Sequence, residues 1–347
     1  DGIRGKANRY PMDADTAMNV GRAVARLFFH SGRCRILIGK DPRLSSDMLE
    51  SALAAGIASM GADALLTGML PTPAIAFATR AAGADAGIVV SASHNPYPDN
   101  GIKIFSGQGF KLTDAQEDDI EALVQKQDFS EFLARSEQIG RIRPLENADR
   151  KYLEFLDSVW PENLSMRGIK IAMDTSNGAA SLLAPEAFTR FGAQVEVIHN
   201  HPDGYNINDQ CGSQHTAGLQ ELTVKCGADL GLAFDGDADR LIAVDETGKR
   251  LSGDQILLIC AIMLKNLGKL QKDCLVTTVM SNLGLRLACR KHKLRHHASE
   301  VGDRHVLEDM QRLGAVIGGE ESGHIIFLEH HSTGDGILAG MQLIAAM

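Results

Sequence analysis

The sequence lacks paired cysteines, an excess of basic residues and any apolar run long enough to cross a bilayer. Its six cysteines are scattered and form no C-x-x-C pair, which argues against a disulfide framework or a zinc site and indicates reduced thiols in the cytoplasm. The formal net charge is −9, whereas nucleic-acid and membrane-surface binding need a basic face. We therefore expect a cytoplasmic protein that binds neither nucleic acid nor membrane.

A secretory signal peptide and an initiator methionine are also missing from the sequence. The chain begins at Asp1 and stops within the apolar run 342–347, so we expect it to be part of a longer protein. Its 347 residues are too many for one ordinary domain. The contents of 44% hydrophobic and 23% charged residues are normal for a soluble globular protein.

Strand patterns alternate with helical patterns along the chain. Helical periodicity is clear around Val20–Phe28, around Leu49–Ile57 and around Tyr152–Val159, where Trp160-Pro161 ends it. The polar stretch 125–147 predicts a surface helix and loop near a boundary. This alternation predicts an α/β fold with mostly parallel sheets sandwiched by helices. Strands are expected at 35–39, 86–90, 169–173, 228–234, 241–244 and 275–279.

A weak internal repeat runs through the sequence. A Gly-Ala pair introduces a strand in each block, at 83–84, 227–228 and 314–315, and each of these strands leads into a polar constellation. The repeat predicts three similar α/β domains around a central cleft. We place them at residues 1–147, 148–253 and 254–347.

The first constellation, the serine loop Ser91–Pro96, follows the apolar run 86–90 and precedes a dense turn signal. Hydroxyl-rich loops at the ends of buried strands are where α/β sheets place chemistry, although a polar turn with a helix N-cap is the simpler alternative. His94 is a chain neighbour of the serines and a poor triad base, and no G-x-S-x-G elbow occurs. Phosphoryl transfer therefore fits better than acyl transfer.

The second constellation, the metal loop 235–240, contains Asp235, Asp237 and Asp239. Two like charges about 4 Å apart cost roughly 4 kcal/mol at an effective dielectric near 20, so three converging carboxylates need a cation. Oxygen ligands suit Mg²⁺ or Ca²⁺ rather than zinc. An EF-hand would use Glu246 at its twelfth position, but its sixth position is Arg240 instead of glycine and its flanks read as strands. An acidic surface turn is the other alternative.

The third constellation, the sugar loop 319–324, offers alternating acceptors and donors after a glycine bend. Such a set suits the hydroxyl groups of a sugar, and His324 could also move protons. A solvated acidic turn is the alternative. Arg4, Arg43 and Lys103 could supply positive charge, although each could equally be a surface cation.

Four motifs in order carry a family resemblance. The segments DGIRG (1–5), SASHNP (91–96) followed by NGIK (100–103), DGDADR (235–240) and GEESGH (319–324) resemble the α-D-phosphohexomutase family over almost the whole chain. Within the family, the opening DGIRG and the overall residue pattern are most similar to the bacterial branch that acts on glucosamine phosphates. The resemblance implies interconversion of glucosamine 6-phosphate and glucosamine 1-phosphate through a bisphosphorylated sugar, which is both intermediate and activator.

The resemblance also implies a role for each motif. Ser93, rather than Ser91, would be the phosphoserine, and a phosphosugar would be the substrate. The implied assignments are Mg²⁺ held by Asp235, Asp237, Asp239 and a phosphate oxygen on Ser93; phosphate contact by Arg240; sugar contact by Glu320, Ser322 and His324; and charged or proton-transferring roles for Arg4, Lys103 and His324. We add His94 to the candidate catalytic residues and Arg43 to the candidate substrate-binding residues.

The sequence departs from the family pattern in places. Pro42 and Ser46 stand where the family often has threonine and glycine, and Ala238 stands where glycine is common, a mild change if its φ is not positive. The family's fourth domain, with its phosphate-gripping loop, has no counterpart here, so we expect weak or no turnover. Other family sugars (glucose or mannose phosphates), a residual metal-dependent phosphatase and a non-enzymatic calcium-binding protein are the alternatives. Formation of a homodimer is a further possibility that the sequence leaves open.

Overall fold

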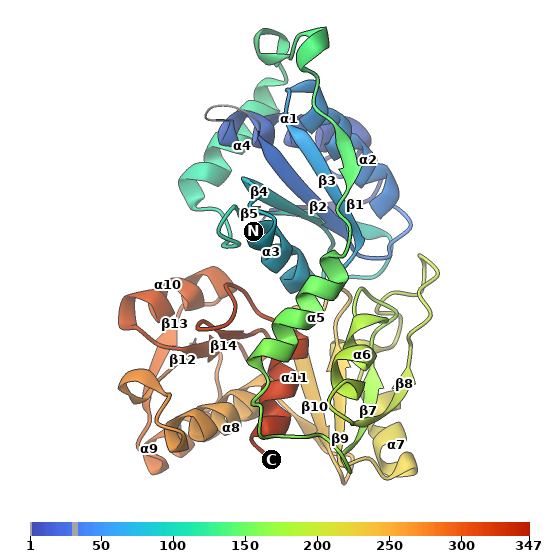
Figure 1. The fold of residues 1–347 in the computed structure, drawn as a ribbon. Coiled ribbons are helices and arrows are strands. Elements are labelled where there is room, and N and C mark those ends of the chain that lie inside the picture. The colour runs from blue at the N-terminus through green and yellow to red at the C-terminus, as the bar shows by residue number, and fades with distance from the viewer. Residues whose placement is uncertain (1, 30–33) are drawn as a thin grey trace. The chain divides into compact units, whose positions relative to one another are not determined.

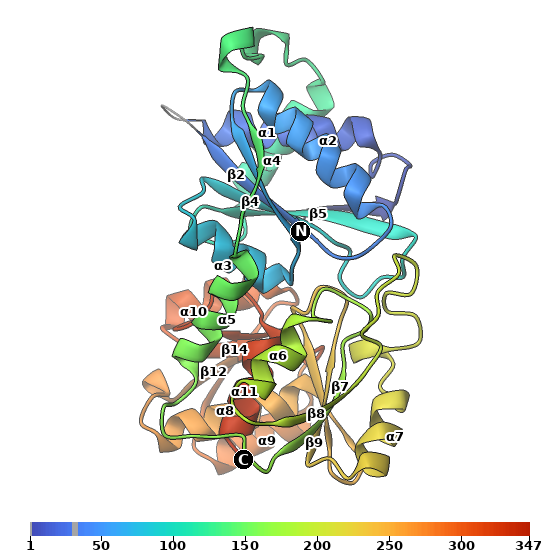
Figure 2. The ribbon, with the colours of Figure 1, turned by 45° about the vertical axis from the view of Figure 1, so that its right-hand side comes forward.

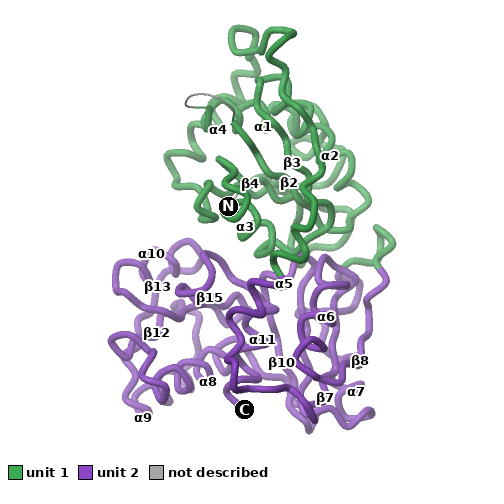
Figure 3. Tube along the Cα trace, viewed as in Figure 1, with its two compact units in different colours: residues 1–152, 202–207 green, residues 153–201, 208–347 purple. Residues whose placement is uncertain are grey.

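The computed structural model describes residues 2–29 and 34–347, which fall into two compact units (Figure 3). Unit 1 comprises the described residues up to 152 together with 202–207, and unit 2 comprises 153–201 and 208–347. The division falls inside helix α5 (Ala148–Val159). The domain boundaries expected at 147/148 and 253/254 stay predictions.

Unit 1 contains a six-stranded mixed sheet in the order β1-β5-β4-β2-β3-β6. Its parallel part is β4-β2-β3-β6, and β5 and β1 are added antiparallel. The elements are β1 (Ile3–Lys6), α1 (Ala14–Phe28), β2 (Arg35–Lys40), α2 (Ser46–Ser59), β3 (Asp63–Met69), α3 (Thr72–Ala81), β4 (Ala86–Val90), β5 (Asp99–Ser106), α4 (Asp114–Lys126), the 3₁₀ turns Ser130–Phe132 and Ser136–Gln138, and β6 (Ile142–Pro144).

Helices cover both faces of the unit 1 sheet. In Figures 1 and 2, α1, α2 and α4 lie on one side of the sheet and α3 lies on the other. Because side chains alternate along a strand, Ile36 and Ile38 of β2 join the core that α1 and α2 cover, whereas Gly39 approaches Ile75 of α3. This packing fixes the direction in which the strand ends point.

Unit 2 contains two mixed sheets, ordered β11-β10-β9-β7-β8 and β13-β12-β14-β15. The elements are β7 (Lys170–Asp174), α6 (Leu183–Thr189), β8 (Gln194–Ile198), the 3₁₀ turn Gly212–Gln214, α7 (Ala217–Cys226), β9 (Leu230–Phe234), β10 (Leu241–Asp245), β11 (Arg250–Leu251), α8 (Gly253–Asn266), the 3₁₀ turn Gln271–Asp273, β12 (Cys274–Thr278), α9 (Leu283–Lys291), β13 (Arg295–Ser299), α10 (Asp303–Leu313), β14 (Ile317–Gly319), β15 (Ile325–Phe327) and α11 (Gly336–Ala345).

Helix α11 joins the two sheets of unit 2. It contacts β10 of the first sheet and β15 of the second, as well as α6 and α8, and Figure 1 shows it between them. Residues 336–344 of this helix are all buried. Their burial ties the two sheets of unit 2 into one body, since apolar area removed from water stabilises by roughly 25 cal/mol per Å².

The three-fold repeat is visible in the backbone. Gly83, Gly227 and Gly314 each adopt a left-handed φ, between 58° and 69°, within two residues of the ends of α3, α7 and α10. The alanine that follows each glycine donates its N–H back to the helix, at 2.8 to 3.0 Å. Glycine is favoured at this left-handed cap because it has no Cβ. The prediction of three similar α/β domains is confirmed.

Two expectations need correction in detail. The stretch 125–147 contains no helix beyond the end of α4. Instead it forms 3₁₀ turns and the exposed edge strand β6, where Pro144 is tolerated because an edge strand need not donate every N–H. The strand expected at 169–173 is shifted by one residue, so that Asp174 ends it. Among the described residues, none of the helices has both the length and the apolar character needed to span a bilayer.

Candidate active site

The serine loop lies at the carboxyl end of β4 in unit 1, and the loop 41–45 follows the neighbouring parallel strand β2. Ser93 is 2% exposed and has a left-handed φ of 52°. Its N–H donates to the hydroxyl of Ser91 at 3.0 Å, and that hydroxyl donates to Asp41 at 2.6 Å. The Ser91 hydroxyl therefore anchors the loop between the backbone of Ser93 and the carboxylate of Asp41.

The side chain of Arg43 holds the same loop by hydrogen bonds to its backbone. Its Nε donates to Asp41 at 2.9 Å, and its two terminal nitrogens donate to four backbone carbonyls, those of Ser93, Asn95, Pro96 and Asp99, at 2.6 to 3.1 Å. A guanidinium has five N–H donors, and all five are used. A direct bond to a substrate would cost Arg43 one of these contacts, so its main role is to shape the loop.

The predicted cations Arg4 and Lys103 lie on one face of the unit 1 sheet. Arg4 of β1 pairs with Gly101 of β5, and Lys103 is two residues further along β5, so both side chains project from the same side. Arg4 Nη1 also donates to Asn95 Oδ1 of the serine loop at 3.5 Å. Arg4 is exposed and Lys103 is 8% exposed. His94 is half-buried beside Ser93.

The metal loop connects β9 to β10 in unit 2. Asp235, Asp237 and Asp239 are 0%, 1% and 6% exposed, and each offers a carboxylate oxygen within 4.8 Å of the other two. The sharp bend that brings them together includes Ala238, whose φ is 56°. The condition under which alanine would be a mild replacement is therefore not met, because left-handed φ costs an L-residue about 1 kcal/mol.

The guanidinium of Arg240 lies close to the carboxylates of the metal loop. Burial by itself would lower the pKa of Arg240, but the charges of Asp239, Asp235, Glu320 and Asp237 outweigh it and raise the pKa above its ordinary value. The Arg240 Nε lies 3.8 Å from Asp239 Oδ1, and the backbone N–H of Arg240 donates to Asp235 Oδ1 at 3.2 Å. One guanidinium leaves the trio with excess negative charge, which a divalent cation would balance.

The sugar loop is bonded directly to the metal loop. The N–H of Leu241 donates to Gly323 at 2.9 Å, and Arg240 and His324 form a β-bridge. His324 is 2% exposed, and its Nδ1 lies 3.8 Å from Oδ2 of Asp239. Glu320 and Ser322 are half-buried. The structure thus brings these two predicted loops together in one compact unit, although they are far apart in sequence.

Among the described residues, two groups could hold a metal ion. The Asp235, Asp237 and Asp239 group supplies only oxygen ligands and fits Mg²⁺. The other group is Asp174, His199 and Cys211, but Asp174 already accepts the N–H groups of Ser176 and Gly212 and lies 3.0 Å from His199. Burial raises the pKa of Cys211 to about 12. That group therefore acts as a structural anchor of the turn 174–178.

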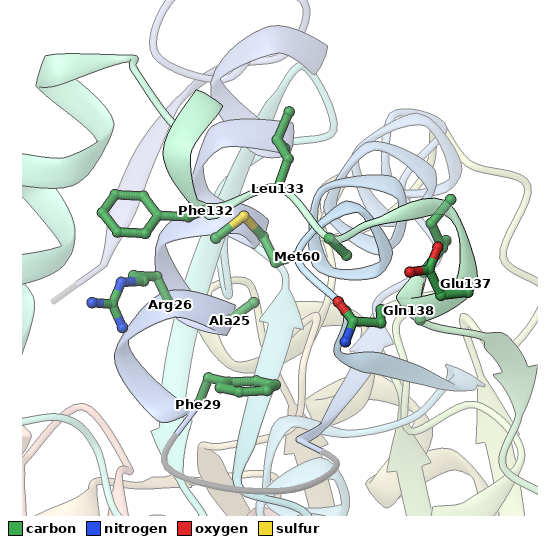
Figure 4. A pocket seen from close by; sticks show the side chains of 12 residues that line it. Ala25, Arg26, Phe29, Met60, Phe132, Leu133, Glu137 and Gln138 are labelled. Carbon is green, nitrogen blue, oxygen red and sulfur yellow. The ribbon is translucent and has the colours of Figure 1, made fainter.

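A pocket of about 520 Å³ in unit 1 contains none of the predicted site residues (Figure 4). It is lined by α1, the end of α2 and the segment 132–140, with Arg26 stacked 4.6 Å from the ring centre of Phe132. The pocket and the predicted site residues of unit 1 therefore do not coincide. The serine loop is identified by its contacts.

Comparison with known proteins gives a consistent family. The three models described as phosphoglucomutase/phosphomannomutase alpha/beta/alpha domains I, II and III match residues 1–131, 150–248 and 252–347. Proteins named phosphoglucosamine mutase from Syntrophobacter fumaroxidans and Syntrophus aciditrophicus are 60% and 52% identical over 348 residues. Each alignment covers 100% of this chain and 78% of the relative.

Solved structures agree at the level of the fold. A phosphoglucomutase/phosphomannomutase family protein from Burkholderia thailandensis superposes with a TM-score of 0.85 at 26% identity, covering 99% of this chain and 75% of the other. A putative phosphomannomutase from Thermus thermophilus has a TM-score of 0.86 at 24% identity, covering 100% and 79%.

Proposed function

This chain belongs to the phosphoglucomutase/phosphomannomutase family, and we propose that it is an intramolecular phosphotransferase that interconverts glucosamine 6-phosphate and glucosamine 1-phosphate. The choice of sugar is supported by the identity of 52–60% to relatives named phosphoglucosamine mutase. The observation that carries the chemistry is the trio of buried carboxylates in unit 2, bonded through the backbone to the sugar loop.

Ser93 is the proposed phosphoryl carrier. In the forward step a sugar hydroxyl oxygen bonds to the phosphorus as the bond from phosphorus to Ser93 Oγ breaks. The proton that the hydroxyl loses is balanced by the proton that the Ser93 oxygen gains. The product is a bisphosphorylated sugar, which reorients in the site and returns its other phosphoryl group to Ser93. The clamp of Arg43 and Asp41 keeps the loop in one shape during both steps, because a preorganised site needs little rearrangement.

Asp235, Asp237 and Asp239 would hold Mg²⁺, with a phosphate oxygen on Ser93 as a further ligand. The ion would neutralise charge that develops on the transferring phosphoryl group. Arg240 would share that phosphate charge, and Arg4, Lys103 and His94 would act near the reacting oxygens. Glu320, Ser322 and His324 would orient the sugar hydroxyls. These residue roles rest on the motifs and on the burial and donor chemistry described above.

The cytoplasm is the proposed location. All six cysteines are free thiols, as expected in a reducing compartment.

Mass spectrometry and a coupled assay test the proposal. We expect one phosphoryl group on Ser93 of the purified chain, lost together with all mutase activity in Ser93→Ala and retained in Ser130→Ala, which changes an exposed serine. Glucosamine phosphates should be preferred over glucose and mannose phosphates. A strong preference for glucose or mannose phosphates would refute the sugar assignment, and phosphate release to water without interconversion would indicate a phosphatase.

A further inference from the structure

A turn outside the four motifs, the tyrosine turn Pro202–Ile207, packs on unit 1. It follows β8 of unit 2 in the sequence, yet it belongs to unit 1, as its colour in Figure 3 shows. Asp203 Oδ1 accepts the N–H groups of Tyr205 and Asn206 at 2.8 and 2.9 Å, and Asn206 Oδ1 accepts the N–H of Asp203 at 3.1 Å. These local bonds give the turn a defined shape of its own.

The tyrosine turn contacts both of the loops that Arg43 joins. The carbonyl of Gly204 accepts the N–H of Leu44, the residue after Arg43, at 3.0 Å. The ring of Tyr205 meets the ring of Tyr97 edge to face, with 5.3 Å between ring centres and 69° between ring planes. Tyr97 directly follows the serine loop. The turn therefore supports the loop 41–45 through its backbone and the end of the serine loop through a side chain.

Tyr97 lies at the tip of a tight turn that closes the serine loop. The side-chain nitrogen of Asn95 donates to Asp99 Oδ2 at 2.9 Å, and the N–H of Asp99 donates to the carbonyl of Pro96 at 3.1 Å. A contact that holds Tyr97 therefore also holds this turn, which is joined through Asn95 to the carbonyl side of Ser93.

The tyrosine pair and Arg43 hold the loop from different sides. Arg43 is 2% exposed and bonds to the loop from the interior of unit 1, whereas both rings of the pair are exposed. Edge-to-face aromatic pairs stabilise beyond the area that they bury. Because these rings lie outside the buried core, loss of their contact should loosen the loop locally and leave unit 1 folded.

We propose that Tyr205 is a positioning residue that acts through Tyr97 to hold the serine loop in the shape that presents Ser93 for phosphoryl transfer. This inference rests on the proposed role of Ser93 as the phosphoryl carrier. Gly204 serves the same end, because its φ of 91° is open to glycine and brings its carbonyl to Leu44. The serine loop is thus supported by a turn that is distant from it in sequence.

Hydrogen exchange of the full chain, measured on its peptides by mass spectrometry, tests the positioning. An aromatic pair is worth at most about a tenfold change in an equilibrium, so Tyr205→Ala should speed exchange of the serine-loop amides by up to about tenfold. The double variant with Tyr97→Ala should exchange no faster than Tyr97→Ala alone, since both changes remove the same contact.

Phe132→Ala is the matched control for the exchange experiment. It removes another exposed ring contact of unit 1, the one with Arg26, in a pocket that contains none of the predicted site residues. Serine-loop exchange in Tyr205→Ala that equals exchange in this control would overturn the inference, and so would additive effects of the two tyrosine variants.

Kinetics connect the position of the loop to the reaction. A displacement of about 1 Å can cost roughly 100-fold in rate, and the Arg43 bonds remain, so Tyr205→Ala should lower kcat by roughly tenfold with a smaller change in KM. Tyr205→Phe keeps the ring and should keep the original kcat. Equal losses in the two variants, or a change in KM alone, would contradict a positioning role.

The two experiments separate this inference from the proposed function. The exchange measurement needs no activity, so a chain that lacks all mutase activity would refute the proposed function and leave the exchange result intact. An active chain whose serine loop exchanges at the same rate with and without the Tyr205 ring would refute the positioning role alone.

Discussion

The serine loop of unit 1 and the metal loop of unit 2 both follow a buried strand and both contain a left-handed residue that is not glycine, Ser93 or Ala238. They are stabilised in opposite ways. Side chains hold the serine loop, because Arg43 and Asp41 bond to it from outside. Backbone contacts hold the metal loop. Its three carboxylates lie close together beside the guanidinium of Arg240. The first loop is held by protein side chains, and the second gathers carboxylates that could hold a cation.

The largest expected effect breaks the clamp in unit 1. Arg43→Ala leaves Asp41 buried without its cation and removes one donor from each of four carbonyls, so we expect the free energy of unfolding to fall by about 3–5 kcal/mol. Arg43→Lys keeps the charge but not the planar guanidinium, so its free energy of unfolding should lie between those of the original chain and Arg43→Ala. Urea denaturation measures both variants.

The Mg²⁺ affinity of the folded Arg43 variants without a phosphoryl group on Ser93 should be unchanged, since the trio lies in unit 2. Arg80→Ala, at an exposed arginine of unit 1, serves as the control. If Arg43→Ala is as mild as this control, the clamp does not stabilise the serine loop.

The next effect concerns the cation. Mg²⁺ at about 100 times its Kd should raise the free energy of unfolding by about 2.7 kcal/mol, and EDTA should remove the gain. Asp237→Asn should abolish the gain and make the metal-free chain more stable than the metal-free original, because it relieves repulsion among buried carboxylates. Thermal denaturation with and without Mg²⁺ measures both effects.

Glu246→Gln is the matched control for the cation experiment, because Glu246 is exposed and would be a ligand only in an EF-hand. A loss of cation binding in this variant, or destabilisation of the metal-free chain by Asp237→Asn, would mean that the loop does not work as described.

A smaller effect concerns the backbone of the metal loop. Ala238→Gly should raise the free energy of unfolding by about 1 kcal/mol, since glycine adopts a left-handed φ without the Cβ clash. Ala243→Gly, at a strand alanine that is equally buried, should lower it instead. Urea midpoints of the two variants give the comparison, and a loss of stability in both would argue that Ala238 is unstrained.

The smallest effect depends on pH. A hydrogen bond to Asp174 raises the pKa of His199 above its ordinary value. A raised folded-state pKa stabilises the chain below the unfolded pKa of about 6.5, and this contribution is lost as the pH rises through the folded pKa. The side chain is partly exposed, so the contribution should stay under about 1 kcal/mol.

His199→Asn should therefore cost stability at mildly acidic pH and almost nothing at alkaline pH, as measured by urea denaturation across that range. This bond supports the turn 174–178, which is followed by Ala179, the donor to Gly236 of the metal loop at 2.8 Å. A cost independent of pH would show that the imidazole only fills space there.

The sequence alone predicted the α/β architecture, the three-fold repeat and the positions of the three loops. These depend on local signals, namely apolar strands, left-handed glycine caps and polar residues at strand ends. It did not predict the strand β13, Arg295–Ser299, because the residues of this strand are mostly polar and show no apolar alternation.

The sequence could not predict contacts that join distant segments. The five bonds of Arg43, the left-handed φ of Ala238 and the packing of Gly334 on His324 arise only in the folded chain. The run Ser332–Gly336 is a recognisable turn signal, but nothing local says which ring or carbonyl it will approach. The sequence therefore predicts which loops would carry chemistry, and the fold shows which contacts hold them.

The most direct test follows the phosphoryl group itself. The chain phosphorylated on Ser93 is mixed with glucosamine 6-phosphate, and intact-protein mass spectrometry records the loss of the group with time. We predict faster loss with Mg²⁺ present than with EDTA or in Asp237→Asn. Transfer at the same rate without the metal, or a phosphoryl group carried by a residue other than Ser93, would contradict the account.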